Sequence, residues 1–422
     1  MEKVLMKGNE ALAEAAIRSG CRFYSGYPIT PQTEILEYMS WRMPEVGGTF
    51  VQTESELAGI NMLYGGTAAG IRAMTSSSGP GFALLQEGIS YLCAADLPAV
   101  LVNVMRIGNG LGDIAQGQGD YWALTRGGGN GDYRTIVLAP NSVQEGMNLV
   151  ALAFELSEKY LHPVIIGSDA AIGQMMEEVE LPEMHEHDID AYEWSVKGTR
   201  AGDPHKVVSN VCFYGHKDYE DYLWNKYKTI EENEQRWESY MTEDAEVICV
   251  AFGISSRICK EAVRLARARG VRLGLIRPIT LWPFPVKAFR QLGAGVKSLL
   301  CVEMNILGQM VEDVKAAVEY RLPVESFRTF FDVPDSEDIA ARAAADEVIR
   351  IGELHADEMA DERLVEPITR AELHGPERQT QSGGAYRVPV PRRFDAPTVG
   401  DGGFSSEVQR AGTCREGIGP HG

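Results

Sequence analysis

The sequence predicts an α/β fold built from two parallel-sheet units, and three observations support this prediction. Short apolar runs typical of buried parallel strands alternate with amphipathic stretches at helical spacing. Most connections between these segments are only a few residues long, as in strand–helix–strand units. The alternation stops after about residue 175 and resumes near Glu246, and a chain of 422 residues is expected to form two or three domains.

The first unit is expected to contain seven short strands, of which Ala99–Met105 is the most apolar because only Asn103 in it is polar. Thr30 is expected to be a helix N-cap, with Pro31 as the first helical residue. The predicted strands cover residues 4–6, 23–25, 50–52, 72–75, 99–105, 134–138 and 163–167. The predicted helices cover residues 9–19, 31–43, a segment ending near 95, and 143–160.

A glycine-rich loop interrupts this pattern between Arg106 and Tyr133. It contains nine glycines and has no strong helical or strand periodicity. Such a long loop inside a compact domain is usually functional or mobile. Loops that follow the carboxyl ends of parallel strands are also where such sheets bind ligands.

The rest of the chain is expected to hold a linker, a second unit and a tail. In the linker, residues 229–240 look like an exposed helix. The second unit is expected to have strands at 247–252, 271–277 and 298–303, a helix at 255–269 and a rigid turn at 281–285. The tail from Glu377 has too few apolar residues to bury a core of its own. The predicted division is 1–195, 196–243 as a helical linker, 244–350, and 351–422 as an extended tail that contacts a partner.

The composition excludes several classes of function. A net charge of −20 argues against nucleic-acid binding, which needs a basic surface. No apolar run is long enough to span a membrane, and the N-terminus lacks the apolar core of a signal peptide, so we expect a cytoplasmic protein. Seven scattered cysteines without a C-x-x-C pair disfavour a zinc or iron–sulfur site held by this chain alone. His185 and His187 have no third ligand at a recognisable spacing.

The stretch from Val51 to Gly70 is the most informative part of the first unit. Thr53 or Ser55 can cap its helix, and carboxylates stand at the head of that helix, where the dipole favours negative charge. A run of small residues follows, which suits close packing against another backbone or a ligand. Glu56 is therefore either a dipole-stabilised surface residue or a buried carboxylate that faces a cofactor.

Several motifs together resemble the alpha subunit of thiamine-diphosphate-dependent 2-oxoacid:ferredoxin oxidoreductases, over about residues 3–350. The 2-ketoisovalerate (branched-chain) and 2-oxoglutarate types are the most similar. The motifs are Gly8-Asn9-Glu10-Ala11, Gly26-Tyr27-Pro28-Ile29-Thr30-Pro31, Glu54-Ser55-Glu56, Thr75-Ser76-Ser77-Ser78-Gly79-Pro80-Gly81, Leu281-Trp282-Pro283-Phe284-Pro285 and Val302-Glu303-Met304-Asn305. The resemblance implies a pyrimidine-binding thiamine-diphosphate domain followed by a transketolase C-terminal-like α/β domain.

The resemblance also implies a reaction and a set of partners. A 2-oxoacid and coenzyme A (CoA) would give an acyl-CoA, CO2 and two electrons, with thiamine diphosphate as the electron sink. A beta subunit would supply the pyrophosphate site and its Mg2+. A gamma subunit and a ferredoxin-like subunit would complete the complex, and iron–sulfur clusters on partner chains would carry the electrons to ferredoxin or another acceptor.

Eight residues match functional positions of the family by this resemblance. Glu56 matches the carboxylate that bonds the pyrimidine ring, Thr30 the threonine beside the reacting carbon, and Arg106 an active-site arginine whose planar donors suit a carboxylate. Thr30 is alternatively only an N-cap, and Arg106 an ordinary loop arginine. The remaining residues, implied to line the cofactor, are Tyr27, Pro28, Ile29, Ser78 and Gly79. No residue of this chain is implied as a metal ligand.

Two departures from the family lie in the glycine-rich loop. The chain has Ile107-Gly108-Asn109-Gly110 where relatives have Gly and Pro, and Asn130-Gly131-Asp132 where they often have His-Gly-Asp. An aromatic 2-oxoacid such as phenylglyoxylate is therefore an alternative substrate. A non-catalytic scaffold subunit and a transketolase-like carboligase are further alternatives. The spacing in Gly108-x-Gly110-x-Gly112 is wrong for a dinucleotide site, and Gly400-Asp401-Gly402 lacks the later asparagine of a pyrophosphate–metal motif.

Overall fold

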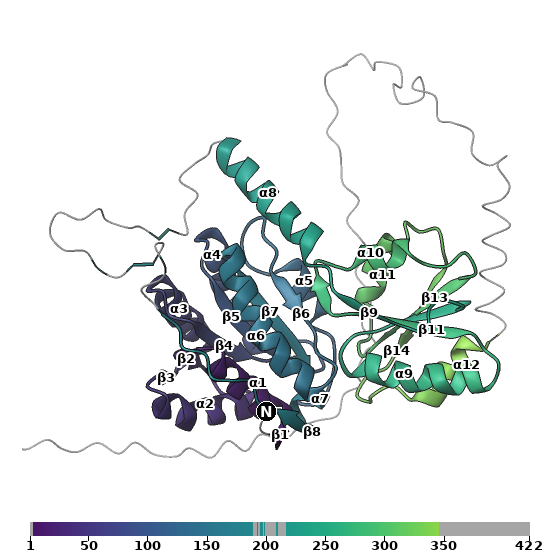
Figure 1. Ribbon diagram of the computed structural model, residues 1–422, viewed down its shortest axis with the longest axis horizontal. Helices are drawn as coiled ribbons and strands as arrows, with labels where there is room; N and C mark the ends of the chain where they lie inside the picture. The colour runs from purple at the N-terminus through teal and green to yellow at the C-terminus, as the bar shows by residue number, and fades with distance from the viewer. Residues whose placement is uncertain are drawn as a thin grey trace, which may run out of the picture. The chain divides into compact units, whose positions relative to one another are not determined.

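The computed structural model describes residues 3–188, 192, 195–196, 198, 208–209 and 217–345. All of these belong to one compact unit that spans Met1–Glu362. It contains two main β-sheets with helices on both faces (Figure 1). The predicted tail at 351–422 lies outside the described residues, as do Cys212, Cys414 and the motif at Gly400.

The first sheet has seven strands in the order β12-β6-β7-β5-β4-β2-β3. All neighbouring pairs in it are parallel except β12 with β6. The strands are β2 (Phe23–Gly26), β3 (Thr49–Gln52), β4 (Ala73–Ser77), β5 (Ala99–Met105), β6 (Ile136–Leu138), β7 (Pro163–Asp169) and β12 (Thr280–Trp282). A separate antiparallel pair joins β1 (Lys3–Lys7) to β8 (Met176–Glu180).

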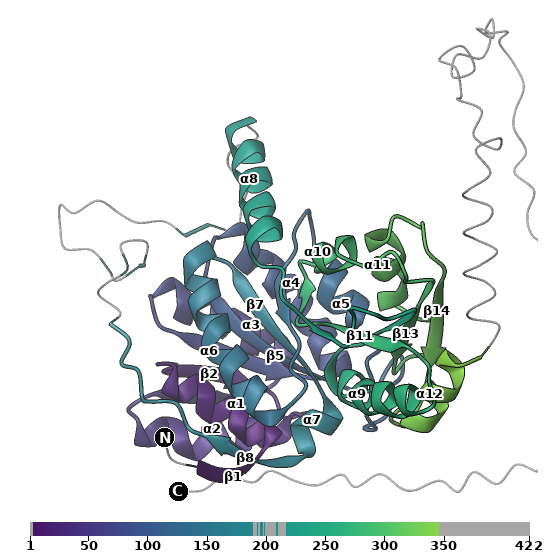
Figure 2. The same ribbon diagram turned by 45° about the vertical axis from the view of Figure 1, so that its right-hand side comes forward.

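Alternate residues of β5 enter the cores on opposite faces of this sheet. Val100 and Val102 belong to the core beneath α1, α2 and α6, whereas Leu101 and Met105 belong to the core beneath α3 and α4. Two-sided burial explains the almost continuous apolar sequence of this strand. The helices of the first unit, visible in Figures 1 and 2, are α1 (Gly8–Arg18), α2 (Thr33–Glu45), α3 (Glu56–Ala68), α4 (Gly79–Ala94), α5 (Tyr121–Arg126), α6 (Val143–Tyr160) and α7 (Ala170–Gln174).

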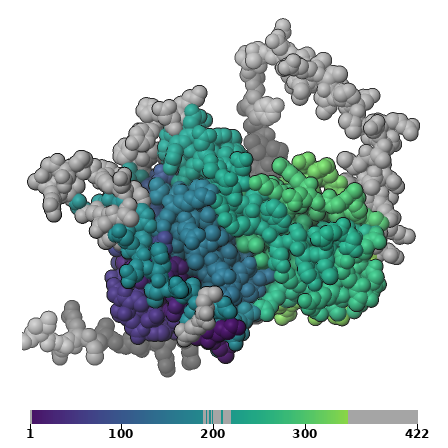
Figure 3. All heavy atoms as spheres, in the orientation of Figure 1, coloured from purple at the N-terminus to yellow at the C-terminus, as the bar shows by residue number. Residues whose placement is uncertain are grey.

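The second sheet has five strands in the order β14-β13-β10-β11-β9, and only β9 is antiparallel to its neighbour. Its strands are β9 (Trp237–Tyr240), β10 (Val247–Val250), β11 (Leu273–Pro278), β13 (Ser298–Glu303) and β14 (Val324–Arg328). Its helices are α9 (Gly253–Ala268), α10 (Val286–Arg290), α11 (Met310–Ala317) and α12 (Ser336–Ala343), and α8 (Lys217–Asn233) precedes the sheet. In Figure 3 the teal and green atoms of this part lie directly against the blue atoms of the first.

Four local predictions were wrong. Thr30 is not the N-cap of α2, because a turn closed by the Gln32 amide on the Ile29 carbonyl (2.8 Å) delays the helix to Thr33. Residues 229–240 are not one helix: α8 ends at Asn233, and Trp237–Tyr240 pairs with the free edge of β11. The turn at 281–285 begins as strand β12. The glycine-rich loop contains helix α5.

Other features follow the sequence closely. Ser55 caps α3, since its side chain accepts a hydrogen bond from the Ala58 amide at 3.3 Å. The described cysteines are all buried and unpaired, and burial raises the pKa of the Cys21 thiol to about 12. No helix within the described ranges is long and apolar enough to cross a membrane.

Candidate functional site

The carboxyl ends of β2, β4 and β5 bring most of the predicted site residues to one edge of the first sheet. The loop at Tyr27–Pro31 follows β2, Ser78 and Gly79 follow β4, and Arg106 follows β5. Because parallel strands end at the same edge, loops far apart in the sequence meet there. Glu56 lies at the head of α3, which packs against both β2 and β4.

Glu56 is 5% exposed although it is a carboxylate. Ser77 at the end of β4 donates a hydrogen bond to Glu56 Oε1 at 3.4 Å. The nearest part of α4 is Gly81, where a Cβ atom would stand only 2.1 Å from Glu56 Oε1 and 2.3 Å from Ser77 Oγ. A residue without a side chain is therefore required at position 81 to leave room for the carboxylate.

Arg106 connects three loops at this edge and is 9% exposed. Its guanidinium donates to the Thr30 carbonyl at 2.7 Å and to the Leu111 carbonyl at 2.5 Å. Its Nε atom faces Gly79, where a Cβ would stand 3.1 Å away. Gly79 has a φ of +45°, a conformation that favours glycine. The structure thus brings Thr30, Gly79 and Arg106 together.

The residues of the Tyr27–Pro31 loop differ in exposure. Tyr27 is 39% exposed, Thr30 is also exposed, Pro28 and Ile29 are half-buried, and Pro31 is buried. The loop is anchored from below by Gln32, which is fully buried and donates to the Tyr24 hydroxyl at 3.0 Å and to Ser76. Buried hydrogen bonds of Gln32 therefore hold the loop in place, and the Tyr27 and Thr30 side chains remain exposed.

Buried polar atoms without a protein partner gather at this edge. Ser78 Oγ, Asn103 Oδ1 and Arg106 Nε are each inaccessible to solvent and make no hydrogen bond among the described residues. Such atoms normally have a partner, so they mark places for a ligand atom or an ordered water. Ser78 is also the N-cap residue of α4, yet its side chain makes no capping bond.

Asp120 is a residue of this site that the sequence prediction missed. Asn103 Nδ2 donates to Asp120 Oδ2 at 3.0 Å. Burial raises the pKa of Asp120, and the Asn103 hydrogen bond, the Gly79 backbone and the positive charge of Arg106 oppose that rise. The available signal was Asn103, an amide in an otherwise apolar strand.

Gln118 fixes the same loop to the second sheet and was also missed. It is fully buried, and its side chain donates to the Phe252 carbonyl at 3.0 Å and accepts from Ser255 Oγ at 3.1 Å. The backbone amide of Gln118 donates to the Met304 carbonyl at 2.7 Å. These groups lie where β10 and β13 end, on either side of the point at which the strand order reverses. Gln118 of the glycine-rich loop therefore lies at the position where such a sheet usually binds a ligand.

Comparison with known proteins identifies the family. Residues 14–245 match the model described as "Pyruvate flavodoxin/ferredoxin oxidoreductase, thiamine diP-bdg", and residues 245–331 match "Pyruvate:ferredoxin oxidoreductase core domain II". Ketoisovalerate oxidoreductase subunit VorB of Methanothermobacter marburgensis is 52% identical over 319 residues, which are 75% of this chain and 90% of the relative. The chain belongs to the 2-oxoacid:ferredoxin oxidoreductase family.

More distant members of this family agree with the assignment. The 2-oxoglutarate synthase subunit KorA of the same organism is 34% identical over 363 residues, covering 77% of this chain and 93% of the relative. The solved 2-oxoglutarate:ferredoxin oxidoreductase of Magnetococcus marinus, with 2-oxoglutarate, coenzyme A and succinyl-CoA bound, matches with a TM-score of 0.70 at 24% identity. That match covers 82% of this chain and 65% of the solved chain. At 24% identity it supports the fold alone. The predicted family and the α/β fold are confirmed.

The residues at this edge fit the thiamine diphosphate that the family's domain binds. The cradle around Glu56 offers a buried carboxylate to a pyrimidine ring, and the unpartnered polar atoms offer both donors and acceptors. In the described part of the chain, no three His, Cys, Asp or Glu side chains are grouped as metal ligands.

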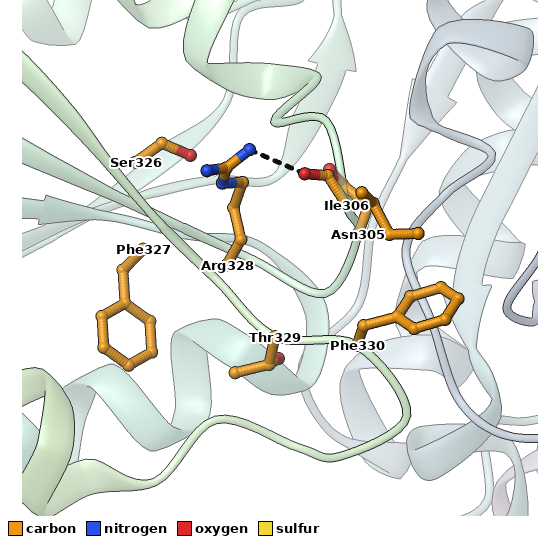
Figure 4. Close-up of a pocket in the computed structure, with 7 residues that line it drawn as sticks. All are labelled: Asn305, Ile306, Ser326, Phe327, Arg328, Thr329 and Phe330. Carbon is orange, nitrogen blue, oxygen red and sulfur yellow. Dashed lines mark hydrogen bonds between the residues drawn. The ribbon is translucent and has the colours of Figure 1, made fainter.

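A surface hollow of about 510 Å³ lies elsewhere, between the loop that follows β13 and the end of β14 (Figure 4). Arg328 in it donates to the Ile306 carbonyl at 2.7 Å. None of its lining residues is a predicted site residue; they are Asn305, Ile306, Ser326, Phe327, Arg328, Thr329 and Phe330.

Proposed function

We propose that this chain is the alpha subunit of an enzyme that oxidatively decarboxylates a 2-oxoacid with CoA. One 2-oxoacid anion and one CoA thiol give an acyl-CoA thioester, CO2, one proton and two electrons. The carbon–carbon bond to the carboxylate breaks, and a carbon–sulfur bond to CoA forms. The electrons leave through iron–sulfur clusters on partner chains to ferredoxin or another acceptor.

The observation that carries this proposal is the buried carboxylate of Glu56 in a cradle kept open by Gly81. When bound, thiamine diphosphate supplies the nucleophilic carbon and the electron sink. Glu56 holds a proton at the pyrimidine ring nitrogen, and Ser77 keeps its carboxylate oriented at 3.4 Å. Tyr27, Pro28, Ile29, Ser78 and Gly79 line the cofactor, and this role rests on their matching the family motifs.

Arg106 and Thr30 are assigned to the substrate. The guanidinium of Arg106 already bonds two carbonyl oxygens, and its Nε has no protein partner, so it keeps donors for the carboxylate of a 2-oxoacid. Thr30 stands beside it on an exposed loop and would contact the reacting carbon. Both residues would position the 2-oxoacid before its bond to the carboxylate carbon breaks.

The favoured substrate is a branched-chain 2-oxoacid. The relative with 52% identity is named for ketoisovalerate. The glycine-rich loop also presents apolar side chains beside Arg106, with Leu111 81% and Ile114 61% exposed. These same side chains suit an aromatic 2-oxoacid such as phenylglyoxylate, which is the second candidate.

Partner subunits complete the proposed enzyme. Both named relatives are subunits of larger oxidoreductases. A beta subunit would hold the pyrophosphate and Mg2+. A gamma subunit and a ferredoxin-like iron–sulfur subunit would complete the complex, and iron–sulfur clusters on partner chains would carry the electrons away.

The experiment is a substrate panel on the purified complex. Branched-chain, aromatic and dicarboxylic 2-oxoacids are each assayed with CoA and a viologen dye. In the complex carrying Glu56→Gln, the rate should fall by about 10²–10⁴-fold, because the proton relay is lost. Glu54→Gln, which changes an exposed carboxylate two residues earlier, is the control and should retain activity. A wild-type rate in Glu56→Gln, or no activity on any 2-oxoacid, would contradict the proposal.

A further inference from the structure

Asn9 joins the start of helix α1 to the loop at Tyr27–Pro31. It is the second residue of α1 and is fully buried. Its Nδ2 atom donates to the Pro31 carbonyl at 2.7 Å and to Glu34 Oε2 at 2.9 Å. A buried amide costs free energy unless it is hydrogen-bonded, so these two bonds account for a polar side chain in the core.

The start of α1 is itself fixed against α7 and the residue that follows it. The Gly8 amide donates to the Met175 carbonyl at 2.9 Å, and a Cβ on Gly8 would stand only 1.9 Å from the Ile172 carbonyl oxygen. A Cβ on Gly173 would stand 2.6 Å from Asn9 Oδ1. These close approaches leave the Asn9 side chain little room to turn, so its donor has a fixed position.

Two successive carbonyl groups of the loop have different partners. The Thr30 carbonyl accepts from Arg106 Nη1 at 2.7 Å, and the Pro31 carbonyl accepts from Asn9 at 2.7 Å. Because peptide units are planar and are joined at each Cα, a displacement of one of these carbonyls also moves the other. Asn9 therefore acts on the carbonyl that receives the Arg106 donor.

Gln32 supports the same turn from the next position in the chain. Its backbone amide donates to the Ile29 carbonyl at 2.8 Å, and its side chain donates to the Tyr24 hydroxyl at 3.0 Å. These bonds close the turn, whereas the bond from Asn9 holds the Pro31 carbonyl. The loop is thus tied to the core at two separate points.

We infer that Asn9 is a positioning residue for the proposed reaction: by fixing the Pro31 carbonyl from within the core, it sets the orientation in which Arg106 receives the 2-oxoacid carboxylate. The inference rests on the proposed role of Arg106. Asn9 is fully buried and does not touch the substrate, so its effect passes through the loop.

The test is a double-mutant cycle in the assembled complex. Asn9→Ala removes the donor to Pro31, and kcat/KM for the 2-oxoacid should fall about tenfold or more, because a small displacement of a group that holds substrate is costly. In an Arg106→Lys background, Asn9→Ala should cause a smaller further loss, because the planar fork that it orients is already absent.

Gly173→Ala covers the case in which Asn9→Ala fails to fold. The added Cβ would stand 2.6 Å from Asn9 Oδ1, so it displaces the side chain while the amide remains. It should also lower kcat/KM, and this loss should likewise shrink in the Arg106→Lys background.

Two control variants separate positioning from lost packing. Leu12→Ala changes a buried residue of the same helix, which faces Gly146 of α6, and it should lower the thermal midpoint without changing kcat/KM of the folded complex. Glu34→Gln alters the other partner of Asn9 but keeps an acceptor oxygen, and it should retain kcat/KM.

The outcomes distinguish the inference from the proposed function. A normal kcat/KM for Arg106→Lys alone would contradict the proposed function of Arg106. If Arg106→Lys is impaired, a normal kcat/KM for Asn9→Ala, or an equal loss in Leu12→Ala, would contradict the positioning role of Asn9. An equal further loss from Asn9→Ala in both backgrounds would also contradict it.

Discussion

At the scale of single residues, very little space surrounds Glu56. Its carboxylate lies where α3 begins, β4 ends and α4 passes closest, and only a glycine at position 81 allows this. A close-packed interior transmits such a constraint because its atoms have few voids to move into. Glu56 and the glycine that accommodates it therefore form one structural unit.

Gly81→Ala should lower activity even though Ala is the better helix former. The added Cβ would overlap Glu56 Oε1 at 2.1 Å, so the carboxylate must leave its position. We expect a loss on the order of 10² or more in the dye-linked assay of the assembled complex. Gly295→Ala is the matched control, because a Cβ there meets no atom within 4 Å. Wild-type activity in Gly81→Ala would show that Glu56 is not held as described.

The sequence was informative about structural features that depend on residues close together in the chain. The cap at Ser55, the head position of Glu56 and strand β5 could each be predicted from local pattern. Asp120 and Gln118 could not, since Asp120 bonds to Asn103 in β5 and Gln118 bonds to the distant Phe252 carbonyl. Their positions depend on tertiary packing, which no local spacing encodes.

At the scale of elements, most of the differences between the sequence predictions and the structure lie at sheet edges and helix ends. The edges of the two sheets are completed by β12 and β9, both antiparallel additions that local sequence described as a turn and as part of a helix.

Helix α11 begins over Glu303, a fully buried carboxylate. Glu303 accepts hydrogen bonds from the amides of Gln309 at 2.9 Å, Met310 at 2.7 Å and Val311 at 3.1 Å.

Glu303→Gln should destabilise the chain. The substitution removes the negative charge that three helix amides face and replaces one acceptor oxygen with a donor, which should cost about 2–3 kcal/mol. Urea unfolding of the isolated chain measures this free energy. Glu312→Gln, an exposed change in the first turn of the same helix, should cost about 0.5 kcal/mol or less. Equal effects of the two substitutions would show that Glu303 does not stabilise α11.

At the scale of the whole molecule, we propose that the chain provides half of an active site. The first sheet carries the proposed pyrimidine cradle and the candidate substrate arginine, and Gln118 ties the glycine-rich loop to the part of the chain that holds the second sheet. The net charge of −20 is unfavourable for the diphosphate of the cofactor. A partner chain should therefore supply the groups that bind this diphosphate, and the active site should form between chains.

Titration calorimetry of the isolated chain with thiamine diphosphate and Mg2+ tests this central claim most directly. The account predicts no binding in the micromolar range for the isolated chain. It predicts tight binding once the beta subunit is added, and loss of that binding when the complex carries Gly81→Ala. Micromolar or tighter binding to this chain alone, or dye reduction without a second subunit, would contradict it.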